Sequence, residues 1–203
     1  MAEPDSLIEL AEVIGRLRRE CAWKATQTHE SLLRFLQEEA HELIEAVETG
    51  SVDDVREELG DVLLQVYLHA AIAEEAGQFT VHDVARGLIE KMVRRNPHVF
   101  GDMDLDDPEA INEAWQAAKA VEKQRAELME GVPETLPALL YADKLVDRAR
   151  RAGRDLALDA EGDLGERLLV LVAEANDKGI DPEQALRRAA RGRIQFSGER
   201  PSP

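Results

Sequence analysis

The chain has 203 residues, with 25 Lys and Arg against 42 Asp and Glu, and a formal net charge of −17. This length fits one or two small domains with a substantial core. The acidic balance excludes a nucleic-acid polymer or an anionic membrane surface as partner, because both bind through clustered basic residues. Cys21 has no partner for a disulfide, and the start MAEPDSLIEL lacks the features of a secretion signal. We therefore expect a cytoplasmic protein without a membrane span.

Apolar residues recur at intervals of three and four along most of the chain, and strand signals are nearly absent. This period predicts an all-α protein. The expected helices cover residues 5–20, 29–49, 52–76, 81–95, 109–130, 137–152, 163–178 and 182–192.

Residues typical of helix ends support these ranges. Side chains suited to N-capping precede four of the helices, namely Ser51, Thr80, Asp107 and Asp181, and proline follows the last two. Gly50 and Gly77 stand where left-handed helix ends are expected.

The segment from Asn96 to Asp107 holds Pro97 and four aspartates, so it should end the fourth helix and cross the surface. A second boundary is expected near Gly131. These breaks predict a first helical domain over 1–130, a second helical domain over 131–196 and a disordered tail over 197–203.

The second domain carries a weak internal repeat. The run Asp163-Leu-Gly-Glu166 is similar to Glu58-Leu-Gly-Asp61, and an apolar helix, a glycine and a further helix follow each run. No counterpart of the first acidic helix precedes the later copy. We interpret it as a degenerate repeat, with chance similarity between helices as the alternative.

Two acidic pairs lie at helical spacing, Glu39-x-x-Glu42 and Glu58-x-x-Asp61. Residues three apart face the same side of a helix, so two adjacent helices would bring four carboxylates together. Two charges about 4 Å apart repel by roughly 4 kcal/mol at an effective dielectric near 20. Because both pairs are embedded in apolar helical patterns, a purely solvated acidic face is the weaker interpretation. The pattern predicts a Mg²⁺ site, with Mn²⁺ as a substitute, held by these four residues.

Three cations, Lys91, Arg94 and Arg95, lie near the end of the fourth expected helix. They could form ion pairs with neighbouring acids. Alternatively they hold phosphates, which Arg binds through bidentate hydrogen bonds and Lys as a compact charge. A metal site combined with a phosphate-binding turn indicates phosphoanhydride chemistry.

These residues resemble the MazG family of nucleoside triphosphate pyrophosphohydrolases, within the all-α pyrophosphatase superfamily. The resemblance runs from about Leu7 to Lys123. It rests on the following motifs: Cys21-Ala-Trp-Lys24, Gln27-Thr-His29, Glu38-Glu-x-x-Glu42, Glu57-Glu-Leu-Gly-Asp61, Arg94-Arg-Asn-Pro-His-Val-Phe100, and Trp115 with Lys119.

The resemblance implies a four-helix-bundle-like fold completed by dimerisation, with a higher homo-oligomer as the alternative. It also implies Mg²⁺-dependent hydrolysis of ribo- or deoxyribonucleoside triphosphates, non-standard ones included, to monophosphate and pyrophosphate. It implies catalytic and metal-binding roles for Glu39, Glu42, Glu58 and Asp61, and a water-orienting role for Glu38. The implied substrate-binding residues are Trp23, Lys24, Gln27, His29, Lys91, Arg94, Arg95, Trp115 and Lys119.

The chain departs from the family where Cys21-Ala-Trp-Lys24 replaces the frequent Cys-Pro-Trp-Asp, which leaves base preference open. Two other interpretations of the chain compete with this one. Glu38-x-x-His41 has the spacing of a di-iron site, but no second Glu-x-x-His accompanies it, as such a bundle requires. A nucleotide-binding or interaction module of MazG type without turnover remains the alternative function.

Overall fold

The computed structural model describes residues 5–123 and 127–196. In these ranges the chain forms ten helices and no strand, which confirms the prediction of an all-α protein. No helix there is long and apolar enough to cross a membrane. The chain divides into two compact units, Met1–Gln116 and Ala117–Pro203.

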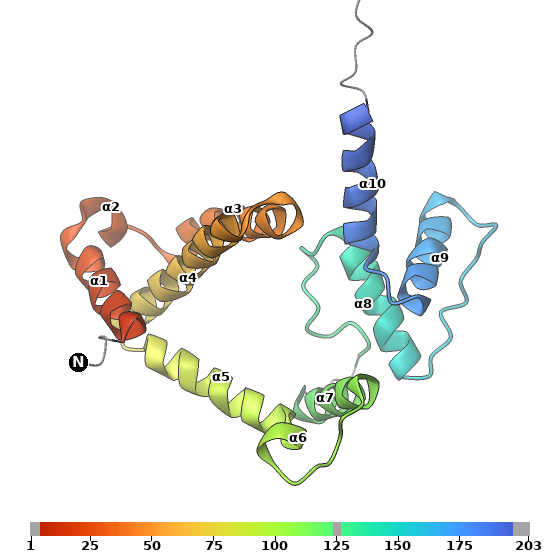
Figure 1. Cartoon of the computed structure of the whole chain (residues 1–203), viewed down its shortest axis with the longest axis horizontal. Coiled ribbons are helices and arrows are strands. Elements are labelled where there is room, and N and C mark those ends of the chain that lie inside the picture. Colours follow the sequence, from red (N-terminus) through yellow and green to blue (C-terminus); the bar gives the residue numbers. More distant parts are fainter. Residues whose placement is uncertain (1–4, 124–126, 197–203) are drawn as a thin grey trace, which may run out of the picture. The chain divides into compact units, whose positions relative to one another are not determined.

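The first unit contains the six helices α1 to α6, drawn from red to light green in Figure 1. They are α1 (Ser6–Glu20), α2 (Ala22–Ala25), α3 (His29–Thr49), α4 (Val52–Glu75), α5 (Val81–Arg95) and α6 (Pro97–Phe100). Helix α7 (Pro108–Lys123) contains the unit boundary. The second unit holds α8 (Ala138–Arg151), α9 (Leu164–Asp177) and α10 (Pro182–Phe196).

The core of the first unit lies where α1, α3 and α4 meet. Its buried members are Ile14, Leu32, Tyr67 and Leu68. Helices α3 and α4 pack against each other more extensively than any other two helices of the described chain. Because Leu32 and Leu68 are 1 % and 2 % exposed, they fix how these two helices lie against each other.

Local capping explains where α4 and α5 begin. The Ser51 and Thr80 side chains accept hydrogen bonds from the backbone N–H groups of Asp54 and Asp83, and these acids accept bonds from the cap N–H groups in return. Such reciprocal bonds satisfy donors that a helix start leaves unpaired. Asp107 and Asp181 also accept backbone N–H groups three residues later, so all four predicted caps are confirmed.

The two glycines behave differently from each other. Gly77 has a φ of 68°, in the left-handed region, as predicted. The same prediction for Gly50 was wrong, because its φ is −86°. A Cβ at Gly50 would lie 2.8 Å from the Ala46 carbonyl oxygen. The short connection between α3 and α4 therefore needs glycine for space.

One connection and two helix ends also differ from the predictions. The segment after Asn96 forms the short helix α6 before it becomes irregular. Residues 127–130 form a turn, whereas the fifth predicted helix was expected to end there. The Arg148 side chain donates to the Leu128 and Glu130 carbonyls, so these carbonyls have hydrogen-bond partners without a helix. Helix α10 continues to Phe196, four residues beyond its predicted end.

The second unit is built around buried Val146, Val172 and Ala173. Its Asp163 is the N-cap of α9 and accepts the backbone N–H of Glu166 at 3.0 Å, whereas Glu58 and Asp61 lie inside α4. The similar acidic runs thus occupy different places in their helices. The interpretation of this unit as a degenerate repeat, and the predicted domain boundary near residue 130, stay predictions.

A buried arginine ties α1 to α4 and to the segment after α2. Arg18 is 6 % exposed, and its guanidinium bonds Glu75 at 2.5 and 3.0 Å. It also donates to the carbonyl of Lys24 and, at 3.0 Å, to that of Gln27. This hydrogen bonding lowers the pKa of Glu75. Arg18 therefore positions the chain that leads into α3.

Replacing Arg18 by Ala is expected to lower the free energy of unfolding by about 2–4 kcal/mol, since two carbonyls and a carboxylate lose a charged donor. Urea unfolding followed by circular dichroism measures this. Part of the loss should vanish at acid pH, because the stability that a lowered carboxyl pKa confers is present above the unfolded pKa and disappears as pH falls.

Arg16→Ala is the matched control, because Arg16 lies on the same helix and forms an exposed ion pair with Glu20. It should change stability by less than about 1 kcal/mol. Equal effects of the two substitutions would contradict the structural role given to Arg18.

Candidate metal centre

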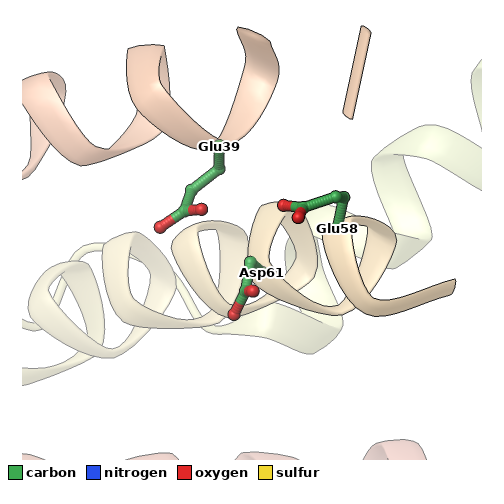
Figure 2. A group of neighbouring side chains, drawn as sticks. All are labelled: Glu39, Glu58 and Asp61. Carbon is green, nitrogen blue, oxygen red and sulfur yellow. The ribbon is translucent and has the colours of Figure 1, made fainter. Parts of the chain in front are cut away.

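Three carboxylates meet across the contact between α3 and α4. Glu39 reaches from α3 toward α4, which carries Glu58 and Asp61 (Figure 2). One oxygen atom from each residue lies within 4.8 Å of the others. The two residues of α4 share a face because they are three positions apart, and the antiparallel partner helix supplies the third.

The surroundings of this cluster favour the neutral forms of two of its members. Burial is the largest cause that raises the pKa of Glu39, and the charges of Asp61 and Glu42 add to it. Burial likewise raises the pKa of Glu58, followed by the charges of Glu42 and Asp61. Burial and like charge both disfavour ionised carboxylates.

The cluster fits a hard divalent cation. The Glu58 Oε2 atom is buried and has no hydrogen-bond partner within the described ranges. No basic side chain there forms an ion pair with any of the three acids. Carboxylate oxygens are the ligands that Mg²⁺ and Mn²⁺ prefer, so a bound cation would supply the missing opposite charge.

The other two predicted acids lie outside the group of three. Glu42 is close enough that, after burial, its charge helps to raise the pKa of Glu58. Glu38 lies on the exposed side of α3, where it pairs with Arg34 at 3.5 Å and lines a shallow surface pocket with Glu42 and Glu45. Their roles as fourth ligand and as water-orienting base stay predictions.

The predicted substrate-binding segment from Trp23 to His29 is ordered by its own polar groups. Gln27 donates from Nε2 to the Trp23 carbonyl at 3.1 Å and accepts from the Ser31 hydroxyl at 2.7 Å. Trp23 is 52 % exposed, its ring meets Phe35 edge-on, and the Lys24 Nζ lies 5.2 Å from the centroid of the Trp23 ring. An exposed indole held in this way could stack against a planar ligand.

His29 pairs with a residue that no sequence motif singled out. Its Nδ1 lies 2.7 Å from Nδ1 of His69 on α4, and the two rings are stacked with centroids 5.0 Å apart. Burial, then the charge of His29, lowers the pKa of His69. The available signal was spacing, since Asp61, Gln65 and His69 follow one another at intervals of four and so share a face of α4.

The predicted basic turn lies at the far end of α5, apart from the α3–α4 pair (Figure 1). Arg95 is 6 % exposed, and its guanidinium lies 5.0 Å from the centroid of Trp115 on α7. This cation–π contact joins α5 to α7. Lys91 and Arg94 are on the same last turns of α5, and Lys119 lies on α7 beyond the unit boundary. Phosphate binding by these residues stays a prediction.

Fold and cluster together define an all-helical protein with a candidate divalent-cation site between two antiparallel helices. The family model described as the MazG nucleotide pyrophosphohydrolase domain matches residues 27–100, which include the whole cluster. The chain belongs to the MazG family, and the predicted resemblance to this enzyme family is confirmed.

Relatives support this assignment over most of the chain. The nucleoside triphosphate pyrophosphohydrolase/pyrophosphatase MazG of Thermotoga maritima is 38 % identical over 90 % of this chain and 80 % of its own length. The nucleoside triphosphate pyrophosphohydrolase of Mycobacterium tuberculosis is 38 % identical over 95 % of this chain but 64 % of its own length. A Streptomyces cacaoi protein described by its position beside blaB is 44 % identical over 91 % of this chain and 78 % of its own length.

Replacing Glu39 by Gln should stabilise the metal-free protein at neutral pH, because it removes one of the repelling charges. A carboxyl whose folded pKa is raised favours the folded state below its unfolded pKa and loses that contribution as pH rises through the folded pKa. The melting temperature of Glu39→Gln in EDTA should therefore exceed that of the wild type by roughly 2–4 °C near pH 7.5. The difference should shrink toward pH 5.

Mg²⁺ should raise the melting temperature of the wild type and leave that of Glu39→Gln nearly unchanged. Glu45→Gln, an exposed change on the same helix, serves as the control and should behave as the wild type. A lower melting temperature of metal-free Glu39→Gln at pH 7.5 would contradict the electrostatic account.

Proposed function

We propose that this chain hydrolyses nucleoside triphosphates to the monophosphate and pyrophosphate in a Mg²⁺-dependent reaction at the α3–α4 carboxylate cluster. The observation that carries the proposal is the meeting of Glu39, Glu58 and Asp61 within 4.8 Å, inside the segment that the MazG family model matches. The names of the relatives support the same reaction.

Glu39, Glu58 and Asp61 would hold the cation, with Glu42 adjacent to them. When bound, Mg²⁺ supplies charge neutralisation and activates water toward phosphate esters and anhydrides; Mn²⁺ has the same preference for oxygen ligands. The carboxylates must be ionised to bind it, so the raised pKa values of Glu39 and Glu58 predict weaker binding at acid pH.

The remaining residues would act on the substrate by position and charge. A nucleoside triphosphate is a polyanion, which carboxylates alone repel. Lys91 and Arg94 would neutralise phosphate oxygens away from the cluster, with Arg95 held by Trp115 beside them. Glu38, next to Glu39 in α3, would orient the attacking water. Trp23 and the ordered segment up to His29 would contact the nucleoside.

Pairing of two copies is part of the proposal. Several large apolar side chains on the helices of the first unit are about half exposed, among them Leu33 on α3, Leu59 on α4 and Leu88 on α5. Monomeric soluble proteins seldom leave many such residues open to water on adjacent helices. A homodimer would cover them and complete a bundle, and the cytoplasm, where nucleotides are plentiful, is the proposed location.

The test is direct measurement of pyrophosphate released from each common ribo- and deoxyribonucleoside triphosphate, with Mg²⁺ or with EDTA. Release that requires Mg²⁺ is expected. Nucleotide binding by calorimetry without pyrophosphate release would favour the alternative, a MazG-type binding module, and would overturn the proposed reaction.

Glu39→Gln and Asp61→Asn should each lower kcat at least about 100-fold while the helical circular dichroism is unchanged, because even outer-shell groups of metal sites typically contribute 10–100-fold. Glu45→Gln should retain wild-type kcat. Activity of either cluster variant near the wild-type level at saturating Mg²⁺ would remove the cluster from the mechanism.

A further inference from the structure

Gln65 is a buried amide beside the carboxylate cluster and has no assigned role. It lies on α4, four residues after Asp61 and so on the same face, and it is 3 % exposed. Tyr67 and Leu68, two and three residues further along α4, belong to the apolar core. A polar side chain in this position needs a physical explanation.

The hydrogen bonds of Gln65 do not stabilise the folded state in a way that would explain why this side chain is buried. The Nε2 atom donates to Oε1 of Glu39 at 3.4 Å, which is long for such a bond. The Oε1 atom is buried and unpaired within the described part of the chain. A buried amide with one long bond and one unsatisfied acceptor disfavours the folded state relative to an apolar side chain of similar size.

We propose that Gln65 is a positioning residue that orients the Glu39 carboxylate toward Glu58 and Asp61 for cation binding. Glu39 crosses from α3 on a flexible side chain, and its carboxylate is the only one of the three that α4 does not carry. A donor fixed to α4 restrains that carboxylate relative to the two acids of α4. The inference rests on the proposed function, since it requires a cation site at this cluster.

A structural and a positioning role make opposite predictions. If Gln65 only held α3 against α4, replacing it would weaken folding and leave any surviving cation site intact. If it positions Glu39, an apolar replacement of similar length keeps or raises stability and weakens cation binding. Outer-shell partners of metal ligands typically change metal affinity about 10–100-fold when they are removed.

The experiment compares wild type, Gln65→Leu and Gln65→Met as full-length, metal-free chains. Isothermal titration with Mn²⁺ alone is expected to give a dissociation constant about 10–100-fold higher for both variants than for the wild type. Their melting temperatures in EDTA are expected to equal or exceed that of the wild type.

Gln37→Leu is the matched control, because Gln37 is exposed on α3 and undergoes the same chemical change. It should bind Mn²⁺ as the wild type does. A reduction in affinity equal to that of Gln65→Leu would show a non-specific effect of the substitution and would overturn the inference.

The remaining outcomes separate the two proposals. Normal Mn²⁺ binding by the wild type and by both Gln65 variants would overturn the role of Gln65 and leave the cation site standing. Loss of helical structure, or a clearly lower melting temperature, in both variants would show a structural residue and would also overturn it. Failure of the wild type to bind Mn²⁺ would overturn the proposed function and this inference together.

Discussion

The close approach of carboxylates across α3 and α4 is the constraint on which the rest of the first unit depends. Two unit charges about 4.8 Å apart repel by roughly 3–4 kcal/mol at an effective dielectric near 20. The helices stay together because Leu32 and Leu68 are buried beside Ile14 and Tyr67, and because Ser51 caps the start of α4. The apolar contact therefore holds α3 and α4 together although the carboxylates repel each other. A bound cation would offset this repulsion.

Helix α4 organises this arrangement along its whole length. Its first half carries Glu58 and Asp61, and its last turn carries Glu75, whose pairing with buried Arg18 holds the segment that precedes α3. His69 meets His29 at the start of α3. His69, which contacts the start of α3, and Glu75, which holds the preceding segment through Arg18, thus lie on the same helix as two of the cluster acids. Helix α4 therefore positions both the candidate metal centre and the Trp23–His29 segment.

Local features of the fold could be predicted from the sequence, and features that depend on how helices meet could not. Capping side chains such as Thr80 act on the next three residues, so they mark helix starts reliably. The spacing of Glu58 and Asp61 likewise places them on one face before any tertiary structure is known. The His29–His69 contact joins positions forty residues apart and follows only from the register of α3 and α4. Gly50 needs glycine for space and not for a left-handed backbone, which no local pattern shows.

Helix α4 carries three buried polar atoms that have no hydrogen-bond partner among residues 5–123 and 127–196: Oε2 of Glu58, Oε1 of Gln65 and Nε2 of His69. Each disfavours folding, and a sequence selected only for stability would place apolar side chains there. By contrast, the buried guanidinium of Arg18 donates hydrogen bonds to both oxygens of the Glu75 carboxylate and to two carbonyls. The fold therefore provides hydrogen-bond partners for a buried charged group that has a structural role. Unsatisfied groups gathered on α4, beside carboxylates with raised pKa values, therefore indicate a surface shaped for a ligand that brings its own charge and hydrogen bonds.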